Sequence, residues 1–135
     1  MQRVIAYVTR ERGGRKELLV FDHRDSPEAG TQVPAGRLDD GESLEAGLRR
    51  ELHEEAGLGD VRIVRELELP PDLGHGVGYE NHAFEVELTS EAPDAWEHVV
   101  LGDGDDAGYV FVYRWEPVRA ELELFDRRDP VLEHL

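Results

Sequence analysis

The segment from Gly36 to Leu58, GRLDDGESLEAGLRRELHEEAGL, constrains the fold of this chain more than any other. Ser43 is a favourable helix N-cap, and the residues after it are mostly strong helix formers. Gly57 is the residue type that commonly ends a helix in a left-handed conformation. These features predict a helix from about Leu44 to Ala56, with a loop on either side of it.

Two stripes of side chains lie next to each other on the predicted helix when residues are placed at roughly 100° intervals. The apolar stripe consists of Leu44, Leu48 and Leu52, and the acidic stripe consists of Glu51, Glu54 and Glu55 at i, i+3, i+4 spacing. We expect the apolar stripe to pack on a sheet. A face that served only solubility would lie opposite that stripe, where Arg49 and His53 are placed instead.

The position of the acidic stripe predicts a metal site. Like charges at the edge of a core are costly unless cations neutralise them. Carboxylate oxygens are the ligands of hard divalent cations that retain water, so we expect Mg²⁺, for which Mn²⁺ would substitute. Gly47 falls on the same face one turn before Glu51, which predicts a space for a phosphate-bearing ligand. The structural alternative, a purely acidic domain, predicts no binding of divalent cations at millimolar concentration.

The residues of this segment resemble the Nudix box at every fixed position. The family pattern G-x5-E-x7-R-E-U-x-E-E-x-G-U, in which U is aliphatic, is matched by Gly36, Glu42, Arg50, Glu51, Leu52, Glu54, Glu55, Gly57 and Leu58. The resemblance implies a loop-helix-loop packed on a mixed sheet. It also implies hydrolysis of the diphosphate bond in a nucleoside diphosphate linked to another moiety, such as ADP-ribose or a nucleotide sugar.

The same resemblance implies roles for individual residues. Glu51, Glu54 and Glu55 would be metal ligands, and one of them would act on the attacking water. The Gly36 carbonyl would join the metal shell, while Arg50 and Glu42 would orient the carboxylates. Metal ions that bridge two phosphates neutralise the substrate and lower the pKa of bound water, so attack can occur near neutral pH. A purely stabilising ion pair is the alternative for Arg50 and Glu42.

Family members often take a further carboxylate from a loop outside the box. An acidic segment that we interpret as a loop offers four candidates, Glu97, Asp103, Asp105 and Asp106. The sequence does not choose among them, and a solvated charge is the alternative for each. We expect recognition of the rest of the substrate to depend on the segment 91–106 and on the glycine-rich loop from Asp72 to Gly78.

The remainder of the chain predicts a sheet for the helix to pack on. Runs of β-branched and aromatic residues predict strands at Arg3–Thr9, Glu17–Asp22, Val61–Leu69, Tyr79–Leu88 and Gly108–Val118, the first two forming a hairpin around Gly13-Gly14. A short helix is expected within 119–135. We therefore predict one α+β domain over residues 1–135, in which the loop-helix-loop and a C-terminal helix pack on a mixed sheet as an α/β/α sandwich-like structure.

Charge and composition limit the partners. The chain has 15 Lys+Arg and 31 Asp+Glu, a formal net charge of −16, so we expect no nucleic acid polymer as a partner. A small nucleoside diphosphate derivative is compatible with this charge when divalent cations lie between it and the carboxylates. No stretch reaches the ~18 apolar residues of a membrane span, and no signal peptide is evident, so we expect a cytoplasmic protein without a membrane partner. A homodimer is a further expectation from the family resemblance.

Two rival functions complete the hypotheses. A Nudix-fold sensor that binds a nucleotide or metabolite without hydrolysing it would show tight binding and no product, although the complete box favours hydrolysis. An isoprenoid diphosphate isomerase on the same fold would require a catalytic cysteine, and the chain contains no cysteine.

Overall fold

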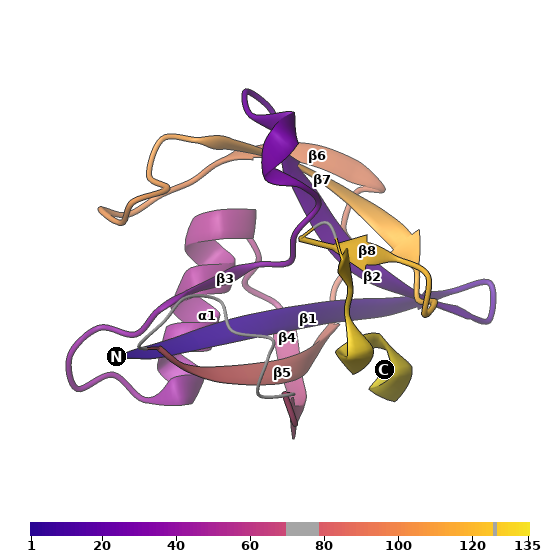
Figure 1. Ribbon diagram of the computed structural model, residues 1–135, viewed down its shortest axis with the longest axis horizontal. Coiled ribbons are helices and arrows are strands. Elements are labelled where there is room, and N and C mark those ends of the chain that lie inside the picture. Colours follow the sequence, from indigo (N-terminus) through magenta and orange to yellow (C-terminus); the bar gives the residue numbers. More distant parts are fainter. Residues whose placement is uncertain (70–78, 126) are drawn as a thin grey trace.

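A mixed sheet with one α-helix packed on it forms the fold of this protein (Figure 1). The computed structural model describes residues 1–69, 79–125 and 127–135. Within them the strands are β1 (Gln2–Arg12), β2 (Arg15–His23), β3 (Ala35–Arg37), β4 (Val61–Leu67), β5 (Glu80–Leu88), β6 (Ala95–Val99), β7 (Val110–Pro117), β8 (Glu123–Leu124) and β9 (Arg127–Arg128). The helices are α1 (Leu44–Ala56) and the 3-10 helices η1 (Pro27–Ala29) and η2 (Pro130–His134). The predicted α+β class with a mixed sheet is confirmed.

Strand β1 organises the sheet because it pairs with three other strands. The sheet order is β4-β5-β1-β2-β7-β6, with β3 also paired to β1. Residues 2–9 of β1 run parallel to residues 80–87 of β5, while residues 3–5 and 9–12 run antiparallel to β3 and β2. The predicted hairpin of β1 and β2 is confirmed, and Gly13 and Gly14 turn it with positive φ angles of 58° and 78°. Strands β2 and β3 share one edge of β1, which places β3 beside α1.

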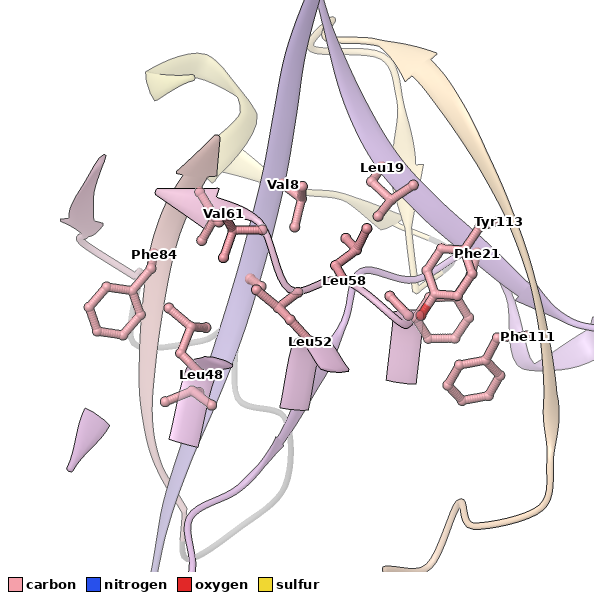
Figure 2. Close-up of a cluster of buried hydrophobic side chains, with 14 of the residues drawn as sticks. Val8, Leu19, Phe21, Leu48, Leu52, Leu58, Val61, Phe84, Phe111 and Tyr113 are labelled. Atoms are coloured by element: carbon pink, nitrogen blue, oxygen red, sulfur yellow. The ribbon is translucent and has the colours of Figure 1, made fainter. Parts of the chain in front are cut away.

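Helix α1 has the predicted bounds and covers one face of the sheet. The Ser43 hydroxyl accepts a hydrogen bond from the Ala46 amide at 3.1 Å, and Gly57 ends the helix with φ 73°. Leu48 and Leu52 are buried among side chains of several strands, including Val8, Leu19, Phe21, Phe84 and Phe111 (Figure 2). None of the helices in the described ranges is long and apolar enough to cross a membrane.

The other face of the sheet is covered by the C-terminal segment, but not by an α-helix. Leu122, Leu124, Val131 and Leu132 from that segment bury Ile5 and Tyr7 of β1. The Tyr7 hydroxyl donates a hydrogen bond to Asp129 at 2.5 Å, and Asp129 also caps η2 by accepting from the Val131 amide. The expected short C-terminal helix is present as the 3-10 helix η2, which follows the β8–β9 ribbon and Asp129.

Strand β6 was not expected, since its residues lie in the segment interpreted as an acidic loop. It pairs antiparallel with β7 from Ala95 to Val99. Trp96 and His98 are partly buried, whereas Ala95, Glu97 and Val99 between them are exposed. This alternation is that of a short edge strand with one exposed face, but that face combines Ala95 and Val99 with the single charged residue Glu97, so the sequence shows no alternation of apolar and polar residues. The expected glycine-rich loop from Asp72 to Gly78 lies outside the described residues.

Candidate active site

The Nudix-like segment and the β6–β7 loop line one cavity of about 590 Å³. Its wall includes β3, the acidic stripe of α1 and three aspartates of the loop; the lining residues used below are Arg3, Gly36, Arg37, Arg50, Glu51, Glu54, Glu55, Tyr79, Asp103, Asp105 and Asp106. The structure therefore brings the predicted acidic stripe together at one cavity, with cationic side chains on the same wall.

Glu51 and Glu55 lie at the inner side of this cavity, at the border of the hydrophobic core. They are 9% and 5% exposed, so the predicted contact between the acidic and apolar stripes is confirmed. A Cβ at Gly36 would lie 2.1 Å from the Glu51 carboxyl carbon, so no larger residue fits there without displacing that carboxylate. The amide of Ala35 donates to Glu55 at 3.3 Å. The backbone of β3 thus lies directly against both carboxyl groups.

Burial makes ionisation of these two carboxyl groups unfavourable. Burial raises the pKa of Glu55 well above its ordinary value of 4.5, and the charge of Glu51 and the hydrogen bond between the two raise it further. Burial also raises the pKa of Glu51, despite the hydrogen bond with Glu55 and the charge of Arg50, which oppose the rise. Two adjacent buried carboxyl groups that resist ionisation fit a hard divalent cation, because such a cation stabilises their charged forms.

Arg50 links the acidic stripe to the loop before the helix. Its Nε and Nη2 each donate to Glu42 at 2.9 Å, and Nη1 donates to Glu51 at 3.0 Å and to Glu54 at 3.1 Å. The hydrogen bonds from Arg50 lower the pKa of Glu42, and Glu42 in turn raises the pKa of Arg50. The pair thus has the contacts that an orienting role requires, since one guanidinium donates to three carboxylates and lies 3.4 Å from a fourth, that of Asp39.

Two of the three glutamates of the stripe, Glu51 and Glu54, form an ion cluster with Arg50, whereas Glu55 does not contact it. In the ranges 1–69, 79–125 and 127–135, no group of three or more histidine, aspartate or glutamate side chains has the geometry of a metal site. Arg50 supplies positive charge to Glu51 and Glu54, which is the charge that a cation would contribute. Glu54 is less buried than its two neighbours, with a side chain 25% exposed, and it faces the β6–β7 loop.

The structure places three of the four candidate carboxylates outside the box at the cavity and the fourth away from it. Asp103, Asp105 and Asp106 line the cavity, and Glu97 does not, because it lies on the outer face of β6 beside Arg24 at 3.4 Å. Asp105 pairs with Arg37 of β3 at 3.3 Å. The negative charge of Asp106 contributes to raising the pKa of Glu55. Among these candidates, Asp106 is therefore the one whose charge acts on Glu55.

Gly102 brings the β6–β7 loop against Glu54, a contact that was not predicted. A Cβ at Gly102 would lie 2.9 Å from the Glu54 carboxyl carbon, and its φ of 93° also favours glycine. The preceding Leu101 amide donates to the Glu54 carbonyl at 2.9 Å. Arg3 and Arg37, which also line the cavity, were missed as well. Arg3 stands at the start of the predicted strand and Arg37 directly follows Gly36, and no pattern in the sequence sets either of them apart.

The prediction of a space for a phosphate-bearing ligand at Gly47 is wrong. A Cβ at this position would lie 2.0 Å from Leu38 Cδ2 and 3.1 Å from Glu42 Oε1. Leu38 follows β3 and packs against the core cluster under α1, so its side chain fills the place that the missing Cβ leaves. Glycine is needed there for close packing, and a phosphate group would have to bind elsewhere in the cavity.

Comparison with known proteins places this chain in a family. The NUDIX domain family model matches residues 1–135. RNA pyrophosphohydrolases from two strains of Caulobacter vibrioides, NA1000 / CB15N and ATCC 19089 / CIP 103742 / CB 15, are 44% identical to the chain over 102 residues, or 76% of it. The chain spans about half the length of these curated relatives, since the matched region is 51% of each.

Solved structures with the same fold are more distant in sequence. An Ap4A hydrolase from C. elegans superposes with a TM-score of 0.58 at 19% identity, over 87% of this chain and 80% of that one. A UDP-X diphosphatase superposes with a TM-score of 0.62 at 14% identity, over 95% and 56%. These likenesses support the fold, and the family match over the whole chain identifies it: the protein belongs to the NUDIX domain family.

Proposed function

We propose that this protein is a Mg²⁺-dependent hydrolase that cleaves the diphosphate bond in a nucleoside diphosphate linked to another moiety, such as ADP-ribose or a nucleotide sugar. The observation that carries the proposal is the adjacent pair of buried carboxyl groups, Glu51 and Glu55, which border the cavity with raised pKa values. Membership of the NUDIX family supports the reaction class. The curated relatives support it too, since both are named pyrophosphohydrolases.

Six of the nine fixed box residues have a role in this proposal. Glu51, Glu54 and Glu55, with the Gly36 carbonyl, would hold the divalent cation, whose bound form supplies Lewis acidity toward the phosphate oxygens and the attacking water. Arg50 fixes the rotamers of Glu51 and Glu54 through Nη1, and Glu42 fixes Arg50 through its other nitrogens. The chain thereby presents preoriented carboxylates and avoids reorganisation at the reacting phosphorus.

Residues outside the box would complete the site. Asp106 is the proposed further carboxylate, because its charge acts on Glu55 and it lines the same cavity. Arg3 and Arg37 place positive charge on the cavity wall, where it would attract the diphosphate of the substrate. The Arg3 guanidinium lies 5.5 Å from the centre of the Tyr79 ring, so an aromatic surface adjoins this charge and could contact a nucleoside.

A second candidate substrate class is RNA that carries a pyrophosphate-bearing end, because the curated relatives are named RNA pyrophosphohydrolases. The net charge of −16 favours a small substrate instead, since an RNA chain would be repelled along its length. The absence of a nucleic acid partner accordingly stays a prediction.

A substrate panel tests the proposal and separates it from the sensor alternative. ADP-ribose, nucleotide sugars, dinucleoside polyphosphates, nucleoside triphosphates and triphosphate-ended RNA would be incubated with Mg²⁺ in ¹⁸O-labelled water and analysed by mass spectrometry. We expect the label on one phosphate of a small substrate. Glu54→Gln and Glu55→Gln should lose most activity, and Glu97→Gln, which alters an exposed glutamate outside the cavity, should retain it. Tight binding without product across the panel would favour the sensor.

A further inference from the structure

Carbonyl groups at the carboxyl end of α1 accept hydrogen bonds from residues of β6, β7 and the segment between them. A helix leaves its last four carbonyl groups without donors from within the helix. In α1 these belong to His53, Glu54, Glu55 and Ala56. The amide of Gly57 takes the first of them at 3.0 Å, as an ordinary C-cap does.

The remaining three carbonyl groups accept hydrogen bonds from side chains far away in sequence. His98 Nε2 lies 2.8 Å from the Glu54 carbonyl oxygen, and the Tyr113 hydroxyl donates to the Glu55 carbonyl at 2.8 Å. Trp96 Nε1 donates to the Ala56 carbonyl at 3.2 Å. Because a carbonyl oxygen only accepts, His98 must donate through its Nε2–H. The Leu101 amide adds a second donor to the Glu54 carbonyl.

The three donor side chains are held in place by packing. The Trp96 and Tyr113 rings stack with their centres 5.1 Å apart and their planes 15° apart. Tyr113 is fully buried and contacts Phe21, whose ring centre is 5.2 Å away. The His98 ring lies against Gly57, where a Cβ would come within 3.2 Å of Cε1 and Nδ1. Packing therefore fixes the three side chains that donate hydrogen bonds to the last turn of α1.

Two of the three bonded carbonyl groups belong to Glu54 and Glu55, whose side chains line the cavity. The direction of a helical side chain follows from its backbone, and terminal turns of helices readily fray. A buried carbonyl group without a donor is energetically unfavourable, so these hydrogen bonds stabilise the helical conformation of the last turn. A small displacement of catalytic groups lowers rate strongly.

We propose that Trp96, His98 and Tyr113 are positioning residues, which hold the last turn of α1 through its carbonyl groups and thereby set the positions of the Glu54 and Glu55 carboxylates. The catalytic consequence rests on the proposed function. The effect on cation binding and on the helix end does not depend on turnover of any substrate.

Two matched substitutions test the proposal. Tyr113→Phe removes one buried hydroxyl from the helix end, and Tyr7→Phe removes another buried hydroxyl on the opposite face of the sheet, where it bonds Asp129. Both should lower the urea midpoint. Only Tyr113→Phe should weaken Mn²⁺ binding, measured by calorimetry, by about tenfold and lower kcat by about tenfold with KM changed less than about twofold. His98→Gln, which keeps an N–H donor, should retain affinity that His98→Leu loses.

Hydrogen exchange on the cation-free protein supplies a readout that is independent of the proposed function. Tyr113→Phe should speed exchange of the Gly57 and Leu101 amides more than Tyr7→Phe does, because both amides bond carbonyl groups of the last turn. If wild type bound no cation and hydrolysed nothing while this difference persisted, the proposed function would fail and the anchoring of the helix end would stand. Equal effects of the two tyrosine substitutions on exchange, Mn²⁺ affinity and kcat would overturn the proposal.

Discussion

Arg50 and Glu42 are joined by two hydrogen bonds of 2.9 Å, in which Nε and Nη2 of Arg50 on α1 donate to the carboxylate of Glu42 in the preceding loop. The third nitrogen, Nη1, reaches Glu51 and Glu54 on the helix itself. Lysine has a single ammonium group and cannot reproduce this planar arrangement. A shift of Glu42 in the loop would therefore move Arg50 and, with it, the carboxylates of Glu51 and Glu54.

Glu42→Gln should reduce stability in a pH-dependent manner. Hydrogen bonds from Arg50 hold the pKa of Glu42 below its ordinary value of 4.5 in the folded state. The stabilisation is therefore fully present above pH 4.5 and is lost as the pH falls below it. We expect the free energy of unfolding of the variant to be about 1–2 kcal/mol lower than that of wild type at pH 7, and the deficit to be smaller at pH 3. Urea titrations at both pH values measure this, and an equal deficit at each would contradict it.

Glu55→Gln should stabilise the cation-free protein although it loses most activity. Burial raises the pKa of Glu55 in the folded state, so the wild-type chain loses stability as the pH rises above 4.5 toward the folded-state pKa. The neutral amide carries no such penalty, and we expect the variant to gain about 1–2 kcal/mol at pH 8 and little at pH 5. Thermal unfolding in EDTA tests the sign. A variant less stable than wild type at pH 8 would show that Glu55 is not strained by burial.

Divalent cations should stabilise wild type and fail to stabilise Glu55→Gln. A ligand that binds only the folded state adds free energy that grows with its concentration, about 2.7 kcal/mol at 100 times the dissociation constant. The wild-type unfolding midpoint should therefore rise with Mg²⁺ and return to its starting value in EDTA. Glu97→Gln serves as the charge-matched control, because Glu97 lies away from the cavity. Parallel midpoint curves for Glu55→Gln and Glu97→Gln would argue against a cation at Glu55.

Gly36→Ala should disable the site more than it destabilises the fold. The added Cβ would come within 2.3 Å of all three atoms of the Glu51 carboxylate, which must then move. We expect kcat and Mn²⁺ affinity to fall by about tenfold or more, since carboxylate placement controls both. Gly59→Ala is the matched control, as a Cβ there meets nothing within 4 Å. Retention of wild-type kcat by Gly36→Ala would show that Glu51 tolerates displacement.

Local signals explain why the helix and its stripes were predictable. Ser43, Gly57 and the spacing of the leucines act within a few residues, so the bounds of α1 follow from the sequence alone. The contact of Glu51 and Glu55 with the core follows from the same helical period. The turn at Gly13-Gly14 is likewise local.

Features that depend on distant contacts were not predictable in the same way. Strand β6 forms by pairing with β7, and its exposed face mixes Ala95 and Val99 with Glu97, so no alternation of apolar and polar residues marks it in the sequence. Leu38 fills the space at Gly47 only because β3, which Leu38 directly follows, lies beside α1. The choice of Asp106 over Glu97 also required the positions of the β6–β7 loop and of Arg24.

The parallel pairing of β1 with β5 has a consequence for how the chain acquires its structure during synthesis. The paired residues Gln2 and Glu80 are 78 positions apart, so β1 leaves the ribosome long before its parallel partner exists. Until then one edge of an apolar strand stays open, and such an edge invites pairing between chains. Closing this long loop also slows folding. Fragments that stop before β5 should therefore aggregate, and α1 should become fully protected only when β5 has docked.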